Sequence, residues 1–277
     1  MKKQFPLILI GFICILNQAY SQELFNNKTF MWSKGPLVKE ISFSNGQFSY
    51  KYTNYDENPI KVEEMNNITY HIVDIEGISF ISFENERWLF LRSSDFLVLY
   101  NKDSNEPFFF GALDVRDAIG TEGFYRDENL YDVSSSLSEN INGKKINYGA
   151  NNLYDLDLNK PWVEGVNGYG VGEVITINNI AFTNLQIYIY LSNGFVSFDK
   201  PRLYKDNSRV KKIKITDIDT NYSEVIDLSD TPQFQKIIIP KGIGSNQLKI
   251  EILDVYHGIK YDDTCINILG IVGVGYN

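Results

Sequence analysis

The stretch YDLDLNKPWVEGVNGYGVGEVITI, residues 154–177, combines two aspartates, a tryptophan and four closely spaced glycines before an apolar run. A phosphate-binding glycine loop needs a strand before it and a helix after it, with the amino end of the helix facing the anion. Here the glycines precede EVITI, whose β-branched residues predict a strand. We therefore interpret the glycines as tight turns that leave Tyr169 at the tip of a loop.

Short β-type runs extend on both sides of this stretch. Aromatic residues make up 14% of the 277 residues, a composition typical of β-rich proteins. The earlier runs lie between Leu37 and Gly111 and are KEISF, GQFSYKY, ITYHIV, GISFISF, RWLFLR and FLVLY. Polar turns separate them, which favours an antiparallel β-meander that forms a small barrel or sandwich.

The later runs are GEVITI, LQIYIYL, VKKIKIT, SEVIDL, FQKIIIP, QLKIEILDVY and CINILGIV. Their spacing favours a β-sandwich of jelly-roll type, and no helix is predicted. A polar stretch without periodicity separates the two sets of runs and is typical of a linker. We predict an all-β protein with an N-terminal β domain at 22–113, a linker at 114–135 and a jelly roll at 136–277.

The first residues, MKKQFPLILIGFICILNQAYSQ, have the pattern of a secretory signal peptide cleaved after Ser21. A retained transmembrane anchor is the alternative, but the apolar run is too short to span a membrane. Cys14 lacks the small preceding residue expected of a lipoprotein. We therefore expect residues 1–21 to be removed, and the mature chain, without a transmembrane segment, to be secreted or in the cell envelope, periplasmic or extracellular.

The formal net charge of the full chain is −9, and loss of Lys2 and Lys3 makes the mature chain more acidic. Such a protein repels phosphate backbones, so we expect no nucleic-acid partner. Cys265 is then the one remaining cysteine, which excludes an intrachain disulfide. Its apolar neighbours favour a small buried side chain over a nucleophile.

The segment NLYDLDLNKPW, residues 152–162, resembles the N-L-x-D-G-D-x-x-T-x-W stretch of galactose-binding-like jelly rolls of the discoidin, or F5/8 type C, group. The segments WVEGVNGYGVGE, LSNGF, NSRVKKIKI and EILDVYHGIKYDDTCI resemble, in order, motifs of one branch of that superfamily. That branch is the NADase-type glycan-binding, or NAD glycohydrolase translocation, domain. The resemblance covers about half of the chain, from residue 131 to the end, and implies that Trp162 is buried.

Asp155 and Asp157 alternate on a short loop and offer the hard oxygen ligands that Ca²⁺ prefers. The resemblance implies a structural calcium here, completed by a threonine and by a glutamate near the carboxyl end. This chain has Lys160 and Asn267 at those two places. A turn capped by Asx hydrogen bonds remains the alternative to a calcium site.

Sugar recognition needs flat apolar faces and a few fixed polar groups that select hydroxyls. The superfamily places ligands at loops on one end of the sandwich, and three loop segments of this chain carry tyrosine beside polar side chains. The candidate ligand-binding residues are Tyr169, Tyr204, Asn207, Arg209, Tyr261, Asp262 and Asp263. The alternative is that the tyrosines are core residues and that the two aspartates only fix a turn.

Catalytic motifs are not recognisable in the sequence. The two histidines, His71 and His257, lie in different predicted domains, and pairs of glutamates such as Glu63 and Glu64 arise by chance in an acidic chain. We expect a secreted non-catalytic protein whose jelly roll recognises a glycan or a cell-surface ligand. The alternative is a secreted enzyme, NAD glycohydrolase- or glycan-related, in which the jelly roll is a targeting module.

Overall fold

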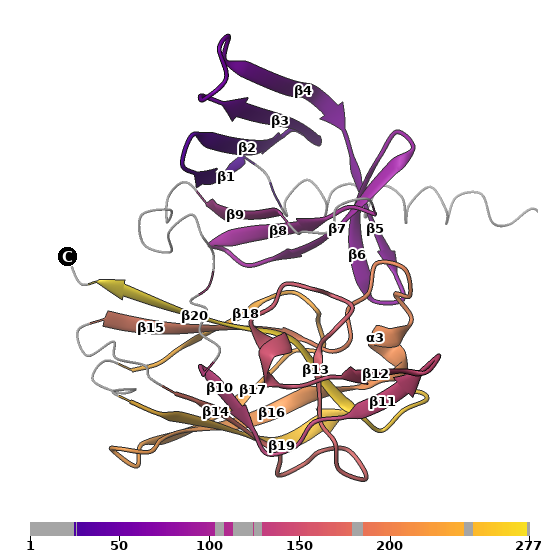
Figure 1. Cartoon of the computed structure of the whole chain (residues 1–277), viewed down its shortest axis with the longest axis vertical. Helices are drawn as coiled ribbons and strands as arrows, with labels where there is room; N and C mark the ends of the chain where they lie inside the picture. The colour runs from indigo at the N-terminus through magenta and orange to yellow at the C-terminus, as the bar shows by residue number, and fades with distance from the viewer. Residues whose placement is uncertain are drawn as a thin grey trace, which may run out of the picture.

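The computed structural model describes residues 25, 27–102, 108–112, 124, 129–178, 185–240 and 246–275, and most of them lie in β-strands (Figure 1). The predicted signal peptide, residues 1–21, and most of the predicted linker lie outside the described residues. Among the helices in these ranges, none is both long enough and apolar enough to cross a membrane.

The N-terminal half forms a single antiparallel sheet, so the predicted β-meander is confirmed. Its strands are β1 (Lys28–Lys34), β2 (Leu37–Ser44), β3 (Gln47–Asn54), β4 (Lys61–Thr69), β5 (His71–Ile75), β6 (Ile78–Phe83), β7 (Glu86–Arg92), β8 (Phe96–Tyr100) and β9 (Phe108–Ala112). Their order is β4-β3-β2-β1-β9-β8-β7-β6-β5. The edges of this N-terminal sheet are therefore β4 and β5, and the nine strands make one open sheet.

Three details of this sheet differ from the predictions. The run ITYHIV was expected to be one strand, but β4 ends at Thr69 and β5 begins at His71. The strand β1 lies before the first predicted run. Most of β4 was also missed, because it is an edge strand with an exposed, polar sequence that shows no apolar alternation.

The C-terminal half is a sandwich of two layers (Figure 1). Its strands are β10 (Tyr131–Val133), β13 (Trp162–Val163), β14 (Val174–Ile177), β15 (Leu185–Asn193), β16 (Ser208–Asp217), β17 (Ser223–Asp227), β18 (Gln235–Ile238), β19 (Leu248–Tyr256) and β20 (Thr264–Gly275). The strands form one hydrogen-bonded path, β10-β14-β19-β16-β20-β15-β18, with β17 beside β16 and β13 beside β20. A short parallel pairing of β16 with β20 joins the layer β10-β14-β19-β16 to the layer β20-β15-β18. All seven predicted runs of this half form strands, and the predicted jelly-roll sandwich is confirmed.

A small hairpin and two short helical turns complete the sandwich. The hairpin pairs β11 (Ser138–Ile141) with β12 (Lys144–Asn147), and the turns are η1 (Ala150–Leu153) and α3 (Leu203–Asp206). Trp162 is fully buried, as the resemblance implied, and its Nε1 donates a hydrogen bond to the carbonyl of Ser135 at 3.1 Å. The strand β10 falls inside the range expected for the linker and pairs with β14. The domain boundaries as a whole stay a prediction.

The side chains of β15 alternate between two hydrophobic cores, so the layer β20-β15-β18 is buried on both faces. Ile187, Ile189 and Leu191 point into the core between the two layers of the sandwich. Tyr188 and Tyr190 point the opposite way, as successive side chains of a strand must. Their face packs against the N-terminal sheet.

The N-terminal sheet shows the same two-sided burial at β6, β7 and β8. On β8, Phe96 and Val98 pack with the tyrosine face of β15, whereas Leu97 and Leu99 face a separate core within the N-terminal sheet. Every residue of β8 is buried, which accounts for its continuous apolar run. The two halves of the chain thus share one hydrophobic core, which lies between the N-terminal sheet and the layer of the sandwich that contains β15 and β20.

Polar contacts reinforce this shared core. Asp95, which is 6% exposed, accepts hydrogen bonds from the Tyr190 hydroxyl and from Nζ of Lys236, the latter at 2.7 Å. The backbone N–H of Phe234 donates to the carbonyl of Arg92 at 3.0 Å. Burial raises the pKa of Asp95, but the hydrogen bonds from Lys236 and Tyr190 outweigh it and hold the pKa below its ordinary value.

Candidate binding surface

The three loop segments singled out in the sequence converge in the structure. The first is loop 164–173, between β13 and β14, and the second is loop 257–263, between β19 and β20. Thr264, the first residue of β20, joins them through a hydrogen bond of 2.8 Å from its Oγ1 to the carbonyl of Tyr169. The Tyr169 ring also lies edge-on to His257, with 4.1 Å between the ring centroids.

The third segment is α3, and its last residues hold loop 257–263 through the backbone. The N–H of Ile259 donates to the carbonyl of Lys205 at 3.0 Å. The carbonyl of Asp206 accepts from the N–H of Lys260 at 3.1 Å and from the N–H of Tyr261 at 2.8 Å. The three segments therefore meet at one end of the sandwich.

Four of the seven predicted ligand residues are accessible there. Tyr169 and Tyr261 are each 38% exposed, Asp262 is exposed and Asp263 is half-buried. The other side chains exposed on the same two loops are the apolar Val166, Val171 and Ile259 and the polar Asn167 and Lys260. We use the name loop surface for all of these side chains, both the four predicted ligand residues and the other exposed side chains of the two loops, together with His257.

Carboxylates and one exposed lysine, Lys260, give the loop surface its electrostatic character. Burial raises the pKa of Asp263, and the neighbouring charge of Asp262 raises it further. Glu164 is fully buried, and this burial raises its pKa, although backbone N–H groups of Val166 and Thr264 donate to its oxygens. A polar ligand that donates hydrogen bonds or carries positive charge is favoured at such a cluster.

The glycines of loop 164–173 form turns, as the sequence predicted. Gly168, Gly170 and Gly172 all have positive φ, a conformation that side chains rarely adopt. Gly170 also lies against Glu164, whose Cγ would be 2.6 Å from a Cβ built on that glycine. The loop therefore depends on glycine both for its backbone conformation and for close packing.

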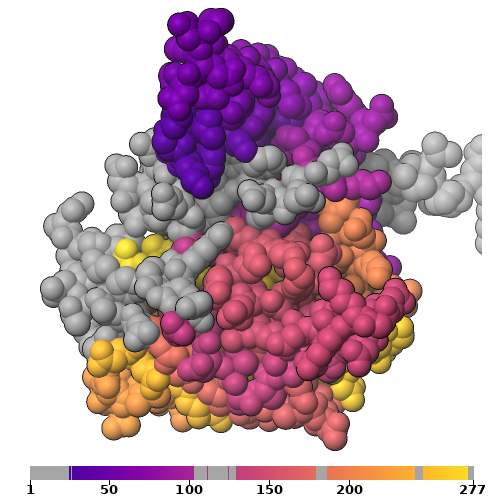
Figure 2. Space-filling view, viewed as in Figure 1, coloured from indigo at the N-terminus to yellow at the C-terminus, as the bar shows by residue number. Residues whose placement is uncertain are grey.

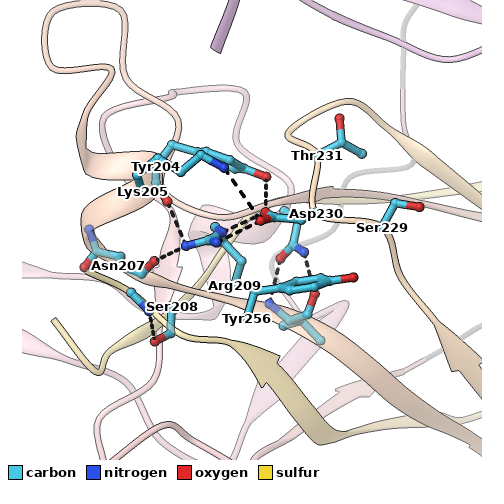
Figure 3. A network of polar contacts seen from close by, with 12 residues as sticks. Tyr204, Lys205, Asn207, Ser208, Arg209, Ser229, Asp230, Thr231 and Tyr256 are labelled. Atoms are coloured by element: carbon cyan, nitrogen blue, oxygen red, sulfur yellow. Dashed lines mark hydrogen bonds and ion pairs between the residues drawn. The ribbon is translucent and has the colours of Figure 1, made fainter. Parts of the chain in front are cut away.

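The other three predicted ligand residues are buried and form a polar network (Figure 3). Tyr204 is fully buried, Asn207 is 6% exposed and Arg209 is 5% exposed. The Nη1 of Arg209 donates to the carbonyl of Asn207 at 2.8 Å. In this arrangement these side chains support the loop surface and are not presented to a ligand.

Asp230 is the centre of this network, and the sequence analysis did not identify it. Its Oδ1 accepts from Nε of Arg209 at 2.9 Å and from the Tyr204 hydroxyl at 2.9 Å, and its Oδ2 accepts from Nη2 of Arg209 at 2.9 Å. Burial raises the pKa of Asp230, but the Arg209 guanidinium outweighs burial and lowers it. For Tyr204, burial raises the pKa and the Asp230 carboxylate raises it further.

The predicted calcium loop contains an ion pair in place of a metal-ligand arrangement. Oδ2 of Asp157 lies 2.9 Å from Nζ of Lys160, and Oδ1 accepts from the N–H of Asn159 at 3.0 Å. The second contact is the Asx turn that was the alternative to calcium. Asp155 is exposed, and the residues that the structure describes contain no group of three or more potential metal-binding His, Cys, Asp or Glu side chains. The residues do not fit a calcium ion unless Lys160 moves away, so calcium stays an untested prediction.

The side chains that could take part in catalysis lie on different strands and loops of the structure. His71 is exposed on β5, whereas His257 contacts Tyr169. Glu64 forms an exposed ion pair with Lys51 at 3.3 Å on the N-terminal sheet. Cys265 is fully buried, and burial raises the pKa of its thiol well above its ordinary value, which disfavours the nucleophilic thiolate.

The fold of the C-terminal half is a discoidin-type sandwich, and the loop surface lies at one end of it. Residues 124–270, more than half of the chain, match the NAD glycohydrolase translocation F5/8 type C domain family. The chain belongs to this family, and the resemblance stated from its motifs is confirmed. No curated protein sequence matches the chain significantly.

Several solved structures are similar at low identity. The family 32 carbohydrate-binding module of C. perfringens NanJ, solved with galactose, has 13% identity and a TM-score of 0.34, over 51% of this chain and 90% of that one. The arabinofuranosyltransferase AftD from Mycobacteria has 12% identity and a TM-score of 0.37, over 53% of this chain and 10% of that one. A glycoside hydrolase has 10% identity and a TM-score of 0.32, over 87% of this chain and 58% of that one. Similarities this weak do not assign a function.

Proposed function

We propose that the protein is a secreted, non-catalytic binding protein that recognises a glycan through the loop surface. Export is supported by the signal-peptide pattern of residues 1–21. A non-catalytic role is supported by the F5/8 type C family and by the separate positions of His71 and His257.

The observation that carries the proposal is the pairing of exposed aromatic rings with carboxylates on two touching loops. Tyr169 and Tyr261 supply aromatic rings of the kind that pack against the C–H groups of a sugar, and Nζ of Lys260 lies over the Tyr261 ring, 4.6 Å from its centroid. Asp262 and Asp263 supply acceptors for sugar hydroxyls. The ion pair of the buried Arg209 with the partly exposed Asp230 holds the segment behind them, so the loops are presented by a rigid support.

Glycan-array binding of the full mature chain tests the proposal, with an NAD-hydrolysis assay run in parallel. The whole chain is needed because the sandwich alone would expose the face of β15 and β20 that the N-terminal sheet covers. We expect selective binding to a set of related glycans, and no hydrolysis. Hydrolysis of NAD without glycan binding would replace the proposal with the enzyme alternative.

A further inference from the structure

The turn between β5 and β6 brings the N-terminal sheet into contact with the support of the loop surface. Glu76 and Gly77 form this turn and both have positive φ, as expected of a tight hairpin turn. A Cβ built on Gly77 would lie 3.0 Å from Cδ1 of Tyr204 and 2.9 Å from Cε of Lys205. The turn therefore lies directly on α3, and Figure 2 shows the orange region around residue 200 meeting the magenta part of the N-terminal sheet.

Tyr204 cannot easily move away from this turn. On its other edge, a Cβ built on Gly194 would lie 2.7 Å from Cδ2 of Tyr204. The Tyr204 hydroxyl donates to Asp230, and the side chain is fully buried. The ring is thus held between two glycine-containing turns, one from each half of the chain.

α3 transmits this contact to loop 257–263. Lys205 touches the β5–β6 turn through its side chain, and its carbonyl accepts the N–H of Ile259. The next residue, Asp206, accepts the N–H groups of Lys260 and Tyr261. Displacement of α3 would therefore move the backbone that carries Tyr261 and the aspartate after it.

We propose that the N-terminal sheet is part of the binding apparatus, and that its β5–β6 turn positions loop 257–263 by pressing on Tyr204 and Lys205. Gly77 is a positioning residue in this scheme, since it touches the support and not the loop surface itself. Glycine suits this position for two reasons: its φ is +88°, and a Cβ there would crowd the Tyr204 ring. The link from Gly77 to the loop backbone rests only on the structure; its consequence for binding rests on the proposed function.

Hydrogen–deuterium exchange of the full mature chain tests the proposal without any ligand. The variants are Gly77→Val and the milder Gly77→Ala, and the matched controls are Gly35→Val and Gly35→Ala. Gly35 lies in the β1–β2 turn of the same sheet and also has positive φ, but a Cβ built there has no neighbour within 4 Å. The controls therefore place a side chain on a positive-φ glycine of the same sheet without the contact on α3.

We expect the Gly77 variants to show faster exchange of the amides of residues 259–261 than the Gly35 controls, when each variant is measured at the same interval below its own melting temperature. Binding to immobilised mucin, used as the glycan probe, should weaken by about 2- to 30-fold in the Gly77 variants only. Equal exchange at residues 259–261 in the Gly77 and Gly35 variants would overturn the proposal. Changed exchange with no binding of mucin by the wild-type chain would instead count against the proposed function, and would leave the positioning role supported.

Discussion

Arg209 on β16 and Asp230 form a two-pronged ion pair, with Nε and Nη2 of the guanidinium each 2.9 Å from a different carboxylate oxygen. The Arg209 side chain is 6% exposed and the Asp230 side chain is 29% exposed. Loss of the carboxylate would leave the buried guanidinium without its charged partner, which is more costly than losing an exposed ion pair. This pair therefore stabilises the segment on which loop 257–263 rests.

Replacing Asp230 by asparagine should destabilise the protein by about 3 kcal/mol at neutral pH, because Arg209 loses its charged partner. The folded-state pKa of Asp230 is lowered, so its contribution is present above the ordinary aspartate pKa and is lost as the pH falls through the folded value. The difference between wild type and Asp230→Asn should thus shrink below about pH 4. Urea unfolding across the pH range measures it.

The control for this substitution is Asp227→Asn. Asp227 pairs with Lys212 at 3.2 Å, but its side chain is 75% exposed. Its loss should therefore change the free energy of unfolding by less than about 1 kcal/mol. Equal effects of the two substitutions would show that the Arg209–Asp230 pair has no special structural role.

The core shared by the two halves predicts cooperative unfolding. Phe96 is fully buried, and its ring centroid lies 4.8 Å from that of Tyr190 and 4.8 Å from that of Phe234. Phe96→Ala should cost about 3–5 kcal/mol and should destabilise both halves together. Variants that retain only Trp88, in the N-terminal sheet, or only Trp162, in the sandwich, would report each half by fluorescence.

Coincident unfolding curves from these two tryptophans are the expected result. Proteolysis within the predicted linker should then give two fragments that stay associated. If the Trp162 transition were unchanged in Phe96→Ala while the Trp88 transition moved, the two halves would be independent units.

The calcium prediction is tested through Lys160, which pairs with Asp157. Lys160→Thr removes this ammonium and places a threonine where the superfamily has one. Calcium at about ten times its Kd should stabilise a binding-competent chain by about 1.4 kcal/mol. We expect a larger calcium-dependent rise of the melting temperature in Lys160→Thr than in wild type, and Asp155→Ala should abolish it. Melting curves of the Lys160→Thr variant that are the same with calcium and with chelator would remove the site.

Most strands could be predicted from the sequence because each is a short run of apolar or aromatic residues bounded by polar turns. The run GISFISF predicts β6, but not that Phe80 faces the sandwich while Ile81 faces the opposite core. Most of β4 could not be predicted, because its residues are exposed and polar and do not alternate with apolar ones. The packing of one sheet on another depends on residues far apart in sequence, so no local pattern reveals it.

The three loop segments named from the sequence do converge, but the exposure of their side chains could not be predicted; the ligand-binding role of these residues stays a prediction. Tyr204 and Arg209 were assigned to the ligand because they occur in a loop-like segment, yet tertiary packing buries both. His257 was missed as a member of the loop surface, since its contact with Tyr169 joins residues 88 positions apart. Asp230 had no local signal, because its role depends on Arg209 from another strand.

The central claim, glycan binding at the loop surface, is tested most directly by Tyr169→Ala and Asp262→Ala. The matched control is Tyr55→Ala, whose tyrosine is 58% exposed on the N-terminal sheet, away from these loops. Titration calorimetry with the best glycan from the array should show each loop variant weakened by about 1–3 kcal/mol, at unchanged melting temperature, and the control unchanged. Wild-type affinity in Tyr169→Ala, or a loss of stability in Asp262→Ala without a selective loss of binding, would contradict the claim.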